Sequence, residues 1–198
     1  VVVLGRRLDV AQSLATEIIK DGGEAMGVSA DVLNSQQLQE AKKRVIQKFG
    51  TINILVNGAG GNMPGATIPS DKTFLDLKID EFQRVVDLNL TGTVLPSQIF
   101  GEVMIASKAG VIINISSMTA IRPLTRVVGY SAAKASVSSF TQWLAVELAK
   151  KFGEGIRVNA IAPGFFLTEQ NRTLLTNPDG SLTDRGNSII RGTPFGRF

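Results

Sequence analysis

The amino-acid sequence predicts an α/β fold: a doubly wound parallel sheet between helices, in three α/β/α layers and a single domain. Short, nearly continuous apolar runs alternate with amphipathic helical stretches along the chain. This alternation is typical of βαβ units whose sheet is covered on both faces. With 198 residues the chain has the length of one ordinary domain, and no internal repeat or linker divides it.

Each element is expected from a local pattern. Strands are expected where apolar and β-branched residues run together, at residues 1–7, 24–31, 52–57, 110–116 and 156–164. Helices are expected where apolar residues recur at helical spacing, at residues 8–23, 36–50, 80–107 and 130–152. The first helix would bury Val10, Leu14 and Ile18, and Ser35 would cap the second. Right-handed connections make this a Rossmann-type domain, in which ligands bind beyond the carboxyl ends of the strands.

The composition excludes several kinds of chemistry. The chain has no histidine and no cysteine, which rules out a Ser-His-Asp triad, a histidine or thiolate metal site and a disulfide. We therefore expect no metal, and acid–base chemistry that uses Tyr, Lys, Ser, Asn or a carboxylate. The net charge of +4 is spread along the chain, which favours a solvated surface over nucleic-acid binding. Without a long apolar span or a visible leader, we expect a soluble, cytoplasmic protein with no membrane partner.

Glycines and polar residues follow three of the expected strands. The run NGAGG at residues 57–61 could bring the backbone close to a nucleotide, although a plain tight turn has the same composition. Ser116 and Ser117 end a later strand. Tyr130 and Lys134 are four residues apart, so they share a face of the next helix. An ammonium about 4 Å from a phenol, at an effective dielectric constant of about 20, favours the phenolate by roughly 4 kcal/mol. Such a pair can exchange protons near neutral pH.

These motifs belong to a longer ordered series. The series is SADV from Ser29, NGAG from Asn57, LNLTG around Asn89, INISS from Ile113, YSAAK from Tyr130, RVNAIAPG from Arg157, and Thr168. Asn89 lies 28 residues before Ser117, which lies 13 residues before Tyr130. In motifs and spacings the chain resembles the short-chain dehydrogenase/reductase family over nearly its whole length. The spacing selects Ser117, and not Ser116, as the counterpart of the family's catalytic serine.

The resemblance implies a four-residue catalytic set and a nicotinamide cofactor. Tyr130 would transfer the proton at the reacting oxygen, and Lys134 would favour the tyrosinate and hold the nicotinamide ribose. Ser117 would hydrogen-bond the substrate oxygen, and Asn89 would hold a water beside Lys134. The implied cofactor-binding residues are Gly5, Arg6, Arg7, Asp31, Val32, Asn57, Gly58, Ala59, Gly60, Tyr130, Lys134, Pro163, Gly164 and Thr168. Hydride transfer would belong to the cofactor itself.

Two parts of the family's domain have no counterpart in this sequence. The first βα unit, with its glycine-rich phosphate turn, is missing before residues 1–7, and the last strand is missing after TPFGRF. We therefore expect the 198 residues to be a portion of a longer protein, truncated or not ordered at both ends. Alone, such a portion would bind a dinucleotide poorly, because the pyrophosphate cradle is lacking.

The tip of the first strand bears on the choice of cofactor. An acidic residue there would accept from the 2′-hydroxyl of NAD, whereas arginine suits the 2′-phosphate of NADP. The tip reads Gly5, Arg6, Arg7, with Asp9 farther on. NADP(H) is therefore favoured, and NAD(H) stays open.

Two segments exceed a minimal member of the family and bear on the substrate. One is an insertion within residues 60–82, and the other is a polar segment at 165–193 that would form a substrate lid with a turn at 177–180. The candidate substrate residues are Asn62, Met118, Arg122, Arg126 and Arg172. The arginines suit a carboxylate, but they could equally face solvent or another subunit. With its insertion the chain resembles the sugar-acid branch of the family, the fructuronate reductases or D-mannonate oxidoreductases. That implies reduction of a keto-sugar acid such as D-fructuronate, or the reverse oxidation of D-mannonate.

Two other functions stay open. A 3-oxoacyl or generic ketone reductase of the same family would need a long apolar groove, whereas the expected lid is rich in Asn, Thr, Arg and Asp. A catalytically silent binding or scaffold protein of this fold is the alternative from another class, and the complete catalytic set argues against it. The resemblance also implies a homotetramer or dimer, formed through the helices that follow Asn89 and Tyr130. The exact substrate and the direction of reaction are not determined by the sequence.

Overall fold

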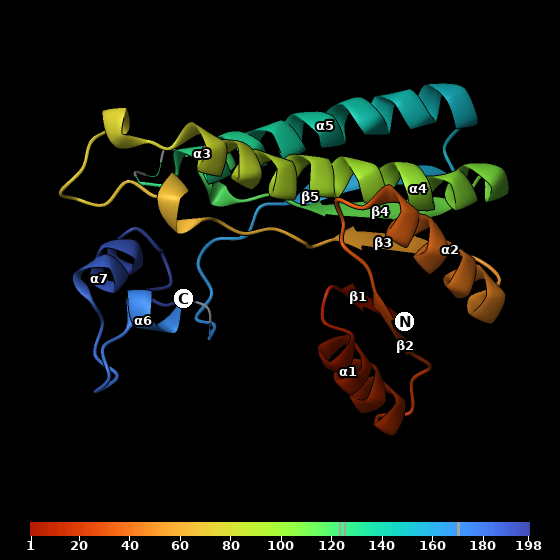
Figure 1. Ribbon diagram of the computed structural model, residues 1–198, viewed down its shortest axis with the longest axis horizontal. Helices are drawn as coiled ribbons and strands as arrows, with labels where there is room; N and C mark the ends of the chain where they lie inside the picture. The colour runs from red at the N-terminus through yellow and green to blue at the C-terminus, as the bar shows by residue number, and fades with distance from the viewer. Residues whose placement is uncertain (123, 125, 170) are drawn as a thin grey trace. The chain divides into compact units, whose positions relative to one another are not determined.

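The computed structural model in Figure 1 describes residues 1–122, 124, 126–169 and 171–198. The chain divides into two compact units, Val1–Ile161 and Ala162–Phe198, and each is described by itself. The larger unit contains the five strands that the sequence predicts and also the four residues of the expected catalytic set.

The larger unit confirms the predicted order of elements. Its strands are β1 (Val2–Gly5), β2 (Met26–Ser29), β3 (Ile54–Asn57), β4 (Gly110–Ile115) and β5 (Ile156–Ile161). Its α-helices are α1 (Leu8–Lys20), α2 (Ser35–Phe49), α3 (Ile79–Val86), α4 (Gly92–Ser107) and α5 (Val128–Phe152). The shorter helical segments are η1 (Pro64–Ala66), η2 (Phe74–Asp76), the π-helical η3 (Asp87–Thr91) and η4 (Met118–Ala120). The stretch predicted as one long helix over 80–107 thus contains a π segment between α3 and α4. No helix in the described part of the chain is long and apolar enough to cross a membrane.

The strands are parallel, as a doubly wound fold requires. β1 pairs with β2, and β3, β4 and β5 form a three-stranded sheet in that order. Asn57 lies opposite Asn114, and Ile115 lies opposite Ile161. The carboxyl ends of β3, β4 and β5 therefore meet at one edge of the sheet. The predicted site residues of the larger unit follow the strands at such ends.

Helices cover the strands in separate layers (Figure 1). α1 packs on β1 and β2, whereas α4 and α5 lie side by side along the β3–β4–β5 sheet. One buried cluster joins β2, α2 and α4 through Val28, Leu38 and Phe100. A second cluster lies between the three-stranded sheet and its helices and includes Met104 and Ile112. This is the Rossmann-type α/β arrangement that the sequence predicts.

The buried face of α1 differs from the predicted stripe. Val10 and Leu14 are 45% and 46% exposed, while Ala11 and Ala15 are buried. α1 lies so close to β2 that a Cβ on Gly27 would stand 2.7 Å from the carbonyl carbon of Ala11. Only small side chains fit at such a distance, so the alanines face the strands. The prediction that Val10 and Leu14 are buried is therefore wrong.

The cap of α2 also differs from the prediction. The Asn34 side-chain oxygen accepts a hydrogen bond of 3.0 Å from Gln37 N, and the helix begins at Ser35. The predicted Ser35 cap is therefore wrong by one residue. The predicted end of the helix is confirmed, because Gly50 follows it in the left-handed conformation with a φ of 76°.

One face of the three-stranded sheet is open to solvent. Ile54, Val56 and Ile161 are 62%, 57% and 52% exposed. Apolar strand residues of a parallel sheet are usually covered on both faces. The helical layer expected over this face is not formed by the described residues.

The smaller unit, residues 162–198, is organised around a tight turn. Its helices are α6 (Arg172–Leu175) and α7 (Asp184–Arg191). An isolated antiparallel bridge joins Thr176 to Leu182. The predicted turn at 177–180 is confirmed by a hydrogen bond of 3.0 Å between its first carbonyl and its last N–H. Position 170, within the expected lid, lies outside the described residues.

Candidate active site

Ser116 and Ser117 lie where β4 ends. Ser116 N donates to the Ile161 carbonyl at 2.8 Å, so the pairing with β5 continues to this point. Ser117 caps the short helix η4, and its Oγ accepts a hydrogen bond of 3.2 Å from Thr119 N. Ser116 is almost fully buried, whereas Ser117 keeps 8% exposure. The two neighbouring hydroxyls therefore have different surroundings.

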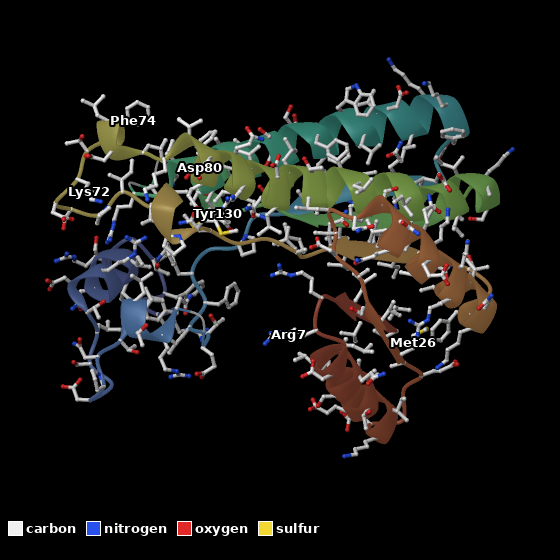
Figure 2. All side chains as sticks on the ribbon, in the orientation of Figure 1. Arg7, Met26, Lys72, Phe74, Asp80 and Tyr130 are labelled. Carbon is white, nitrogen blue, oxygen red and sulfur yellow. The ribbon has the colours of Figure 1, made fainter. Side chains whose placement is uncertain are left out.

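Tyr130, which Figure 2 labels, and Lys134 lie near the start of α5. The Lys134 Nζ atom is 5.6 Å from the centroid of the Tyr130 ring. It also donates a hydrogen bond of 2.6 Å to the carbonyl oxygen of Ile115, the last residue of β4. The Lys134 side chain is buried, with the residue 3% exposed, and this burial lowers the pKa of Lys134 to about 8. The ammonium form still predominates at neutral pH, so a cation stands beside the phenol ring.

Asn89 lies in the π-helical segment and is fully buried. Its Nδ2 atom donates to the carbonyl oxygens of Gly61 and Val85, at 2.7 and 2.8 Å. Its Oδ1 atom accepts from Gly61 N at 3.2 Å. Both amide hydrogens of Asn89 are thus engaged, and its side chain ties the loop after β3 to the π segment. Insertion of a residue into a helix often serves such a purpose at a functional site.

Gly60 stands next to both Asn89 and Lys134. A Cβ at Gly60 would lie 2.6 Å from Asn89 Oδ1 and 3.2 Å from Lys134 Nζ. A side chain at this position would therefore displace two members of the expected catalytic set. Position 60, the last glycine of the NGAG motif, therefore needs a glycine because Asn89 and Lys134 lie so close to it.

A buried ladder of polar side chains runs beneath the site. Asn57 Nδ2 donates to Ser97 Oγ and to Asn114 Oδ1, both at 2.8 Å. Asn114 Nδ2 donates in turn to Thr141 Oγ1 at 2.9 Å. The Asn57 side chain therefore points into the protein, and a ligand beyond β3 would meet its backbone. The rest of this ladder was not predicted from the sequence. The spacing of Asn89, Thr93 and Ser97, four residues apart from η3 into α4, is the signal that could have indicated it.

The tip of β1 presents two cations. Arg6 and Arg7 are exposed, and Figure 2 labels Arg7 after the end of β1. Neither guanidinium forms an ion pair with a carboxylate of the described residues. At the end of β3, a Cβ on Gly58 would meet no atom within 4 Å. Both strand tips are therefore accessible to a ligand.

Asp31 and Val32, which follow β2, are partly buried and have local partners. Asp31 Oδ1 accepts a hydrogen bond of 2.9 Å from Leu33 N, which closes a turn. Val32 packs on the start of α4, where a Cβ at Gly92 would stand 2.9 Å from Val32 Cγ2. These contacts fix the loop that follows β2.

The insertion is joined to the loop that precedes Tyr130. Arg126 has a φ of 79°, which is unusual for a residue with a side chain, and its carbonyl accepts from Ile68 N at 2.9 Å. Asn62 is engaged within the insertion, since its Nδ2 donates to Thr67 Oγ1 at 2.6 Å. The Arg122 and Arg126 side chains are exposed.

Two hydroxyls near the catalytic set have no partner. Thr119 Oγ1 and Ser131 Oγ are buried and hydrogen-bond to no atom of the described residues. Thr119 lies in η4 beside the half-buried Met118, and Ser131 follows Tyr130. A buried hydroxyl without a partner costs about 1–3 kcal/mol. Such groups are candidates for contact with a bound molecule or water.

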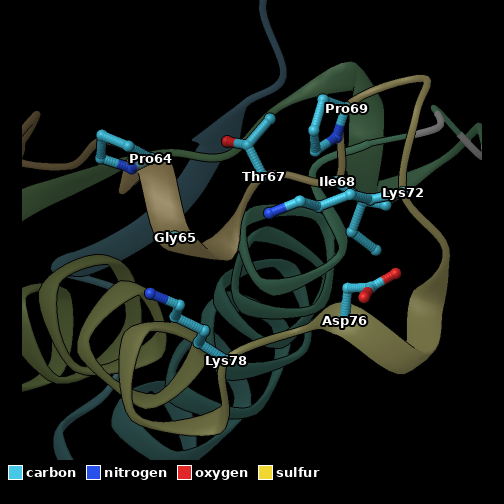
Figure 3. Close-up of a pocket in the computed structure, with 8 residues that line it drawn as sticks. All are labelled: Pro64, Gly65, Thr67, Ile68, Pro69, Lys72, Asp76 and Lys78. Atoms are coloured by element: carbon cyan, nitrogen blue, oxygen red, sulfur yellow. The ribbon is translucent and has the colours of Figure 1, made fainter.

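The insertion also encloses a hollow of about 150 Å³. It is lined by Pro64, Gly65, Thr67, Ile68, Pro69, Lys72, Asp76 and Lys78 (Figure 3). Hydrogen bonds from the backbone and the hydroxyl of Thr73 lower the pKa of Asp76. The two lysines form no ion pair within the described part of the chain. No three acidic side chains among the described residues gather to hold a metal ion.

Two expected site residues of the smaller unit, Thr168 and Arg172, have partners on neighbouring residues. Arg172 forms an ion pair with Glu169 at 3.0 Å, and both side chains are largely exposed. The Thr168 hydroxyl donates to Asn171 Oδ1 at 3.1 Å, and the Thr168 N–H donates to the same atom at 2.8 Å. Pro163 lies before them in an irregular segment. Arg172 is thus not a free cation in this structure.

The chain is similar to known proteins over its whole length. An uncharacterized oxidoreductase, UxuB, of Bacillus subtilis is 45% identical to it and is aligned over 100% of this chain and 73% of its own length. A 3-oxoacyl-[acyl-carrier-protein] reductase of Synechocystis is 39% identical, over 85% of this chain and 64% of its own length.

Two solved structures share the fold closely. A provisionally named D-mannonate oxidoreductase from Haemophilus influenza, with bound NAD, superposes with a TM-score of 0.91 at 42% identity. It covers all of this chain, which spans 73% of that protein. A gluconate 5-dehydrogenase from Burkholderia cenocepacia, in complex with NADP and tartrate, superposes with a TM-score of 0.84 at 29% identity, over 100% of this chain and 71% of its own.

Fold and similarity together define the class of this protein, an NAD(P)-dependent oxidoreductase with a Rossmann-type domain. More narrowly, the chain belongs to the short chain dehydrogenase family, whose model matches residues 1–179.

Proposed function

We propose that this protein reduces a ketone of a carboxylated sugar, such as D-fructuronate, or oxidises the matching alcohol, such as D-mannonate. The observation that supports the reaction type is the buried Lys134 ammonium, held by the tip of β4 and lying 5.6 Å from the Tyr130 ring. A cation in this place favours the phenolate, which makes the tyrosine a proton donor and acceptor for an oxygen at the strand edge.

The proposed roles agree with the hydrogen bonds of the site. Tyr130 gives a proton to the substrate oxygen during reduction and takes it back during oxidation. The Ser117 oxygen already accepts from Thr119 N, so its own proton is free to bond the same substrate oxygen. Both amide hydrogens of Asn89 are engaged, so a water beside Lys134 would bind through the Asn89 oxygen atoms.

We propose that the cofactor lies along the carboxyl ends of the strands. A bound nicotinamide would supply or accept the hydride. The residues proposed to hold the cofactor are Gly5, Arg6, Arg7, Asp31, Val32, Asn57, Gly58, Ala59, Gly60, Tyr130, Lys134, Pro163, Gly164 and Thr168. The open space at Gly58 and the exposed arginines after β1 support this assignment, since the residues present suit a nucleotide.

NADP(H) is the proposed preference, with NAD(H) as the alternative. Arg6 and Arg7 form no ion pair with a described carboxylate and suit a 2′-phosphate. The similar solved structures hold NAD in one case and NADP in the other. Comparing the KM values for the two cofactors tests this preference. A lower KM for NAD would contradict it.

The carboxylated sugar is supported by charge and by similarity. Arg122 and Arg126 are exposed near the site and form no ion pair with a described carboxylate. Arg172 would have to exchange Glu169 for the substrate. Asn62 and Met118 complete the proposed substrate contacts. The similar structures include a provisionally named D-mannonate oxidoreductase and a gluconate 5-dehydrogenase. We further propose that residues 1–198 act as one domain and that 165–193 form its substrate lid.

The main alternative is a 3-oxoacyl or generic ketone reductase, and a reductase of that kind is among the similar proteins. A cofactor-coupled screen of keto-sugar acids, aldonates and 3-oxoacyl thioesters on the full-length protein separates the two. Turnover of thioesters alone would replace the proposed substrate. The further alternative, a silent scaffold of this fold, predicts no turnover of any compound.

Replacing Tyr130 by Phe tests the chemistry directly. Tyr130→Phe removes one hydroxyl, so we expect kcat to fall by about 10²-fold or more, while the protein stays folded. Steady-state kinetics with the best substrate of the screen measure the loss. Unchanged turnover would remove the tyrosine from the mechanism.

We also propose self-association, as a homotetramer or dimer, through α4 and α5. An open hollow of about 470 Å³ over η3, α4 and α5 is lined in part by Leu90, Val94, Phe140 and Trp143. Trp143 and Val146 are 59% and 55% exposed in the single chain. Large apolar residues exposed in this way often mark a surface that a partner subunit covers.

We also propose that the protein acts in the cytoplasm. A chain without cysteine is compatible with that reducing compartment.

A further inference from the structure

We infer that Ser116 is a positioning residue that sets the place of the Lys134 ammonium beside Tyr130. The inference rests on the proposed roles of Tyr130 and Lys134. It gives a function to the serine that the family spacing does not select.

Both the side chain and the main chain of Lys134 are hydrogen-bonded to the tip of β4. Its Nζ atom donates to the Ile115 carbonyl at 2.6 Å. Its main-chain carbonyl accepts a hydrogen bond of 3.0 Å from Ser116 Oγ. Because Ile115 and Ser116 are adjacent, the strand tip sets the positions of both the backbone and the ammonium of the lysine.

A second serine takes part in this contact. Ser138 Oγ lies 2.7 Å from Ser116 Oγ and 3.2 Å from the Lys134 carbonyl oxygen. Each hydroxyl has one proton to donate. One of the two serines therefore donates to the Lys134 carbonyl, and the other donates to the hydroxyl of the first. Ser138 belongs to the same helix as Lys134. The bond from the strand tip to the Lys134 carbonyl therefore depends on Ser116.

The start of α5 has no side-chain N-cap. Val127, the residue before the helix, offers no side-chain hydrogen bond to cap it, although such a cap commonly holds the first turn. The lysine side chain is long and has many rotamers. Ser116 is 1% exposed, and its backbone is bonded to β5. It therefore provides a rigid point against which the first turns of α5 are held.

The test measures ionisation of the Tyr130 phenol from its tyrosinate absorbance, with Tyr130→Phe protein as the blank. We expect Ser116→Ala to raise the pH midpoint by about one unit. Coulomb's law gives a change of this order when an ammonium about 4 to 6 Å from a phenol oxygen moves about 2 Å farther away, at an effective dielectric constant of about 20. Ser116→Cys keeps the shape of the side chain but donates weakly. Ser116→Cys should raise the pH midpoint by less than Ser116→Ala does. It replaces the alanine variant in the test if that variant does not fold.

Thr141→Val is the matched control. Thr141 Oγ1 accepts from Asn114 Nδ2 at 2.9 Å, so Thr141 also joins β4 to α5 in a buried place, without touching Lys134. Its replacement should lower the melting temperature and leave the midpoint where it was. Ser138→Ala should also leave the midpoint nearly unchanged, because Ser116 still reaches the carbonyl.

Turnover provides a separate readout. In alcohol oxidation, kcat/KM of Ser116→Ala should be about tenfold lower below the midpoint and should converge with the wild type at high pH. An unmoved midpoint in both Ser116 variants overturns the inference and leaves the proposed function intact. A moved midpoint together with no turnover of any sugar acid supports the inference and contradicts the proposed function.

Discussion

Lys134 carries its charge in a place where charge is costly. The residue is 3% exposed, and burial alone lowers its pKa from 10.5 to about 8. The site offers the ammonium a carbonyl oxygen and a phenol ring, but no carboxylate within ion-pair distance among the described residues. This arrangement reduces stability and favours chemistry, a trade-off common at active sites.

Lys134→Met should make the protein more stable and inactive. The pKa of Lys134 is lower in the folded than in the unfolded state, so folding opposes protonation. Burying the ammonium lowers the free energy of unfolding by roughly 3 kcal/mol, as an upper figure. This full cost applies below about pH 8, where Lys134 is charged in both the folded and the unfolded state. It disappears as the pH rises from about 8 to 10.5, because only the unfolded state keeps the proton there.

Urea unfolding at a series of pH values measures this effect. Lys134→Met should exceed the wild type near pH 7, and the two free energies of unfolding should converge above about pH 10.5. Lys150→Met, on the same helix at an exposed position, is the control and should show no such convergence. A constant difference between Lys134→Met and wild type at every pH would contradict the linkage.

At the scale of elements, the π segment η3 joins two parts of the site. Asn89 reaches the loop after β3 from this segment, through hydrogen bonds with both backbone groups of Gly61. Thr93 Oγ1 donates to the Asn89 carbonyl at 2.9 Å and continues the link into α4. The π turn thus couples the loop after β3 to the helix that covers the sheet.

Gly60→Ala should disturb this coupling. Its Cβ would approach Asn89 Oδ1 to 2.6 Å, so the loop or the π segment must move, at a cost of about 1–3 kcal/mol. We expect a lower melting temperature together with a lower kcat. Gly61→Ala is the matched control, since its Cβ would come no closer than 3.9 Å to Leu88. Equal melting temperatures for the two variants would show that the close approach of Gly60 to Asn89 does not restrict the side chain at position 60.

For the whole molecule, the exposed apolar residues Trp143 and Val146 of α5 bear on assembly. Trp143→Lys places a charge where the proposed interface must be apolar, so the oligomer should dissociate. Light scattering after size-exclusion chromatography measures the mass. Ile19→Lys changes another exposed apolar residue, on α1, and should leave the mass unchanged. A Trp143→Lys protein with the wild-type mass would exclude this face from the interface.

Much of the fold could be predicted because it depends on local patterns. The strand and helix order follows from apolar periodicity, and the end of α2 follows from Gly50. The face of α1 could not be predicted in this way. Alanines face β2 because Gly27 lets the helix approach closely, and that distance is a property of two elements packed together.

The candidate site divides in the same way. The sequence by itself determined the family, the parallel α/β order and the i, i+4 placement of Tyr130 and Lys134, since these depend on spacing along one chain. The tertiary structure alone decided that Asn57 faces inward, that Gly60 touches Asn89, and that Ser116 holds the backbone of Lys134. Those contacts join strands to helices far apart in sequence. They depend on how closely the two layers pack, which no local pattern records.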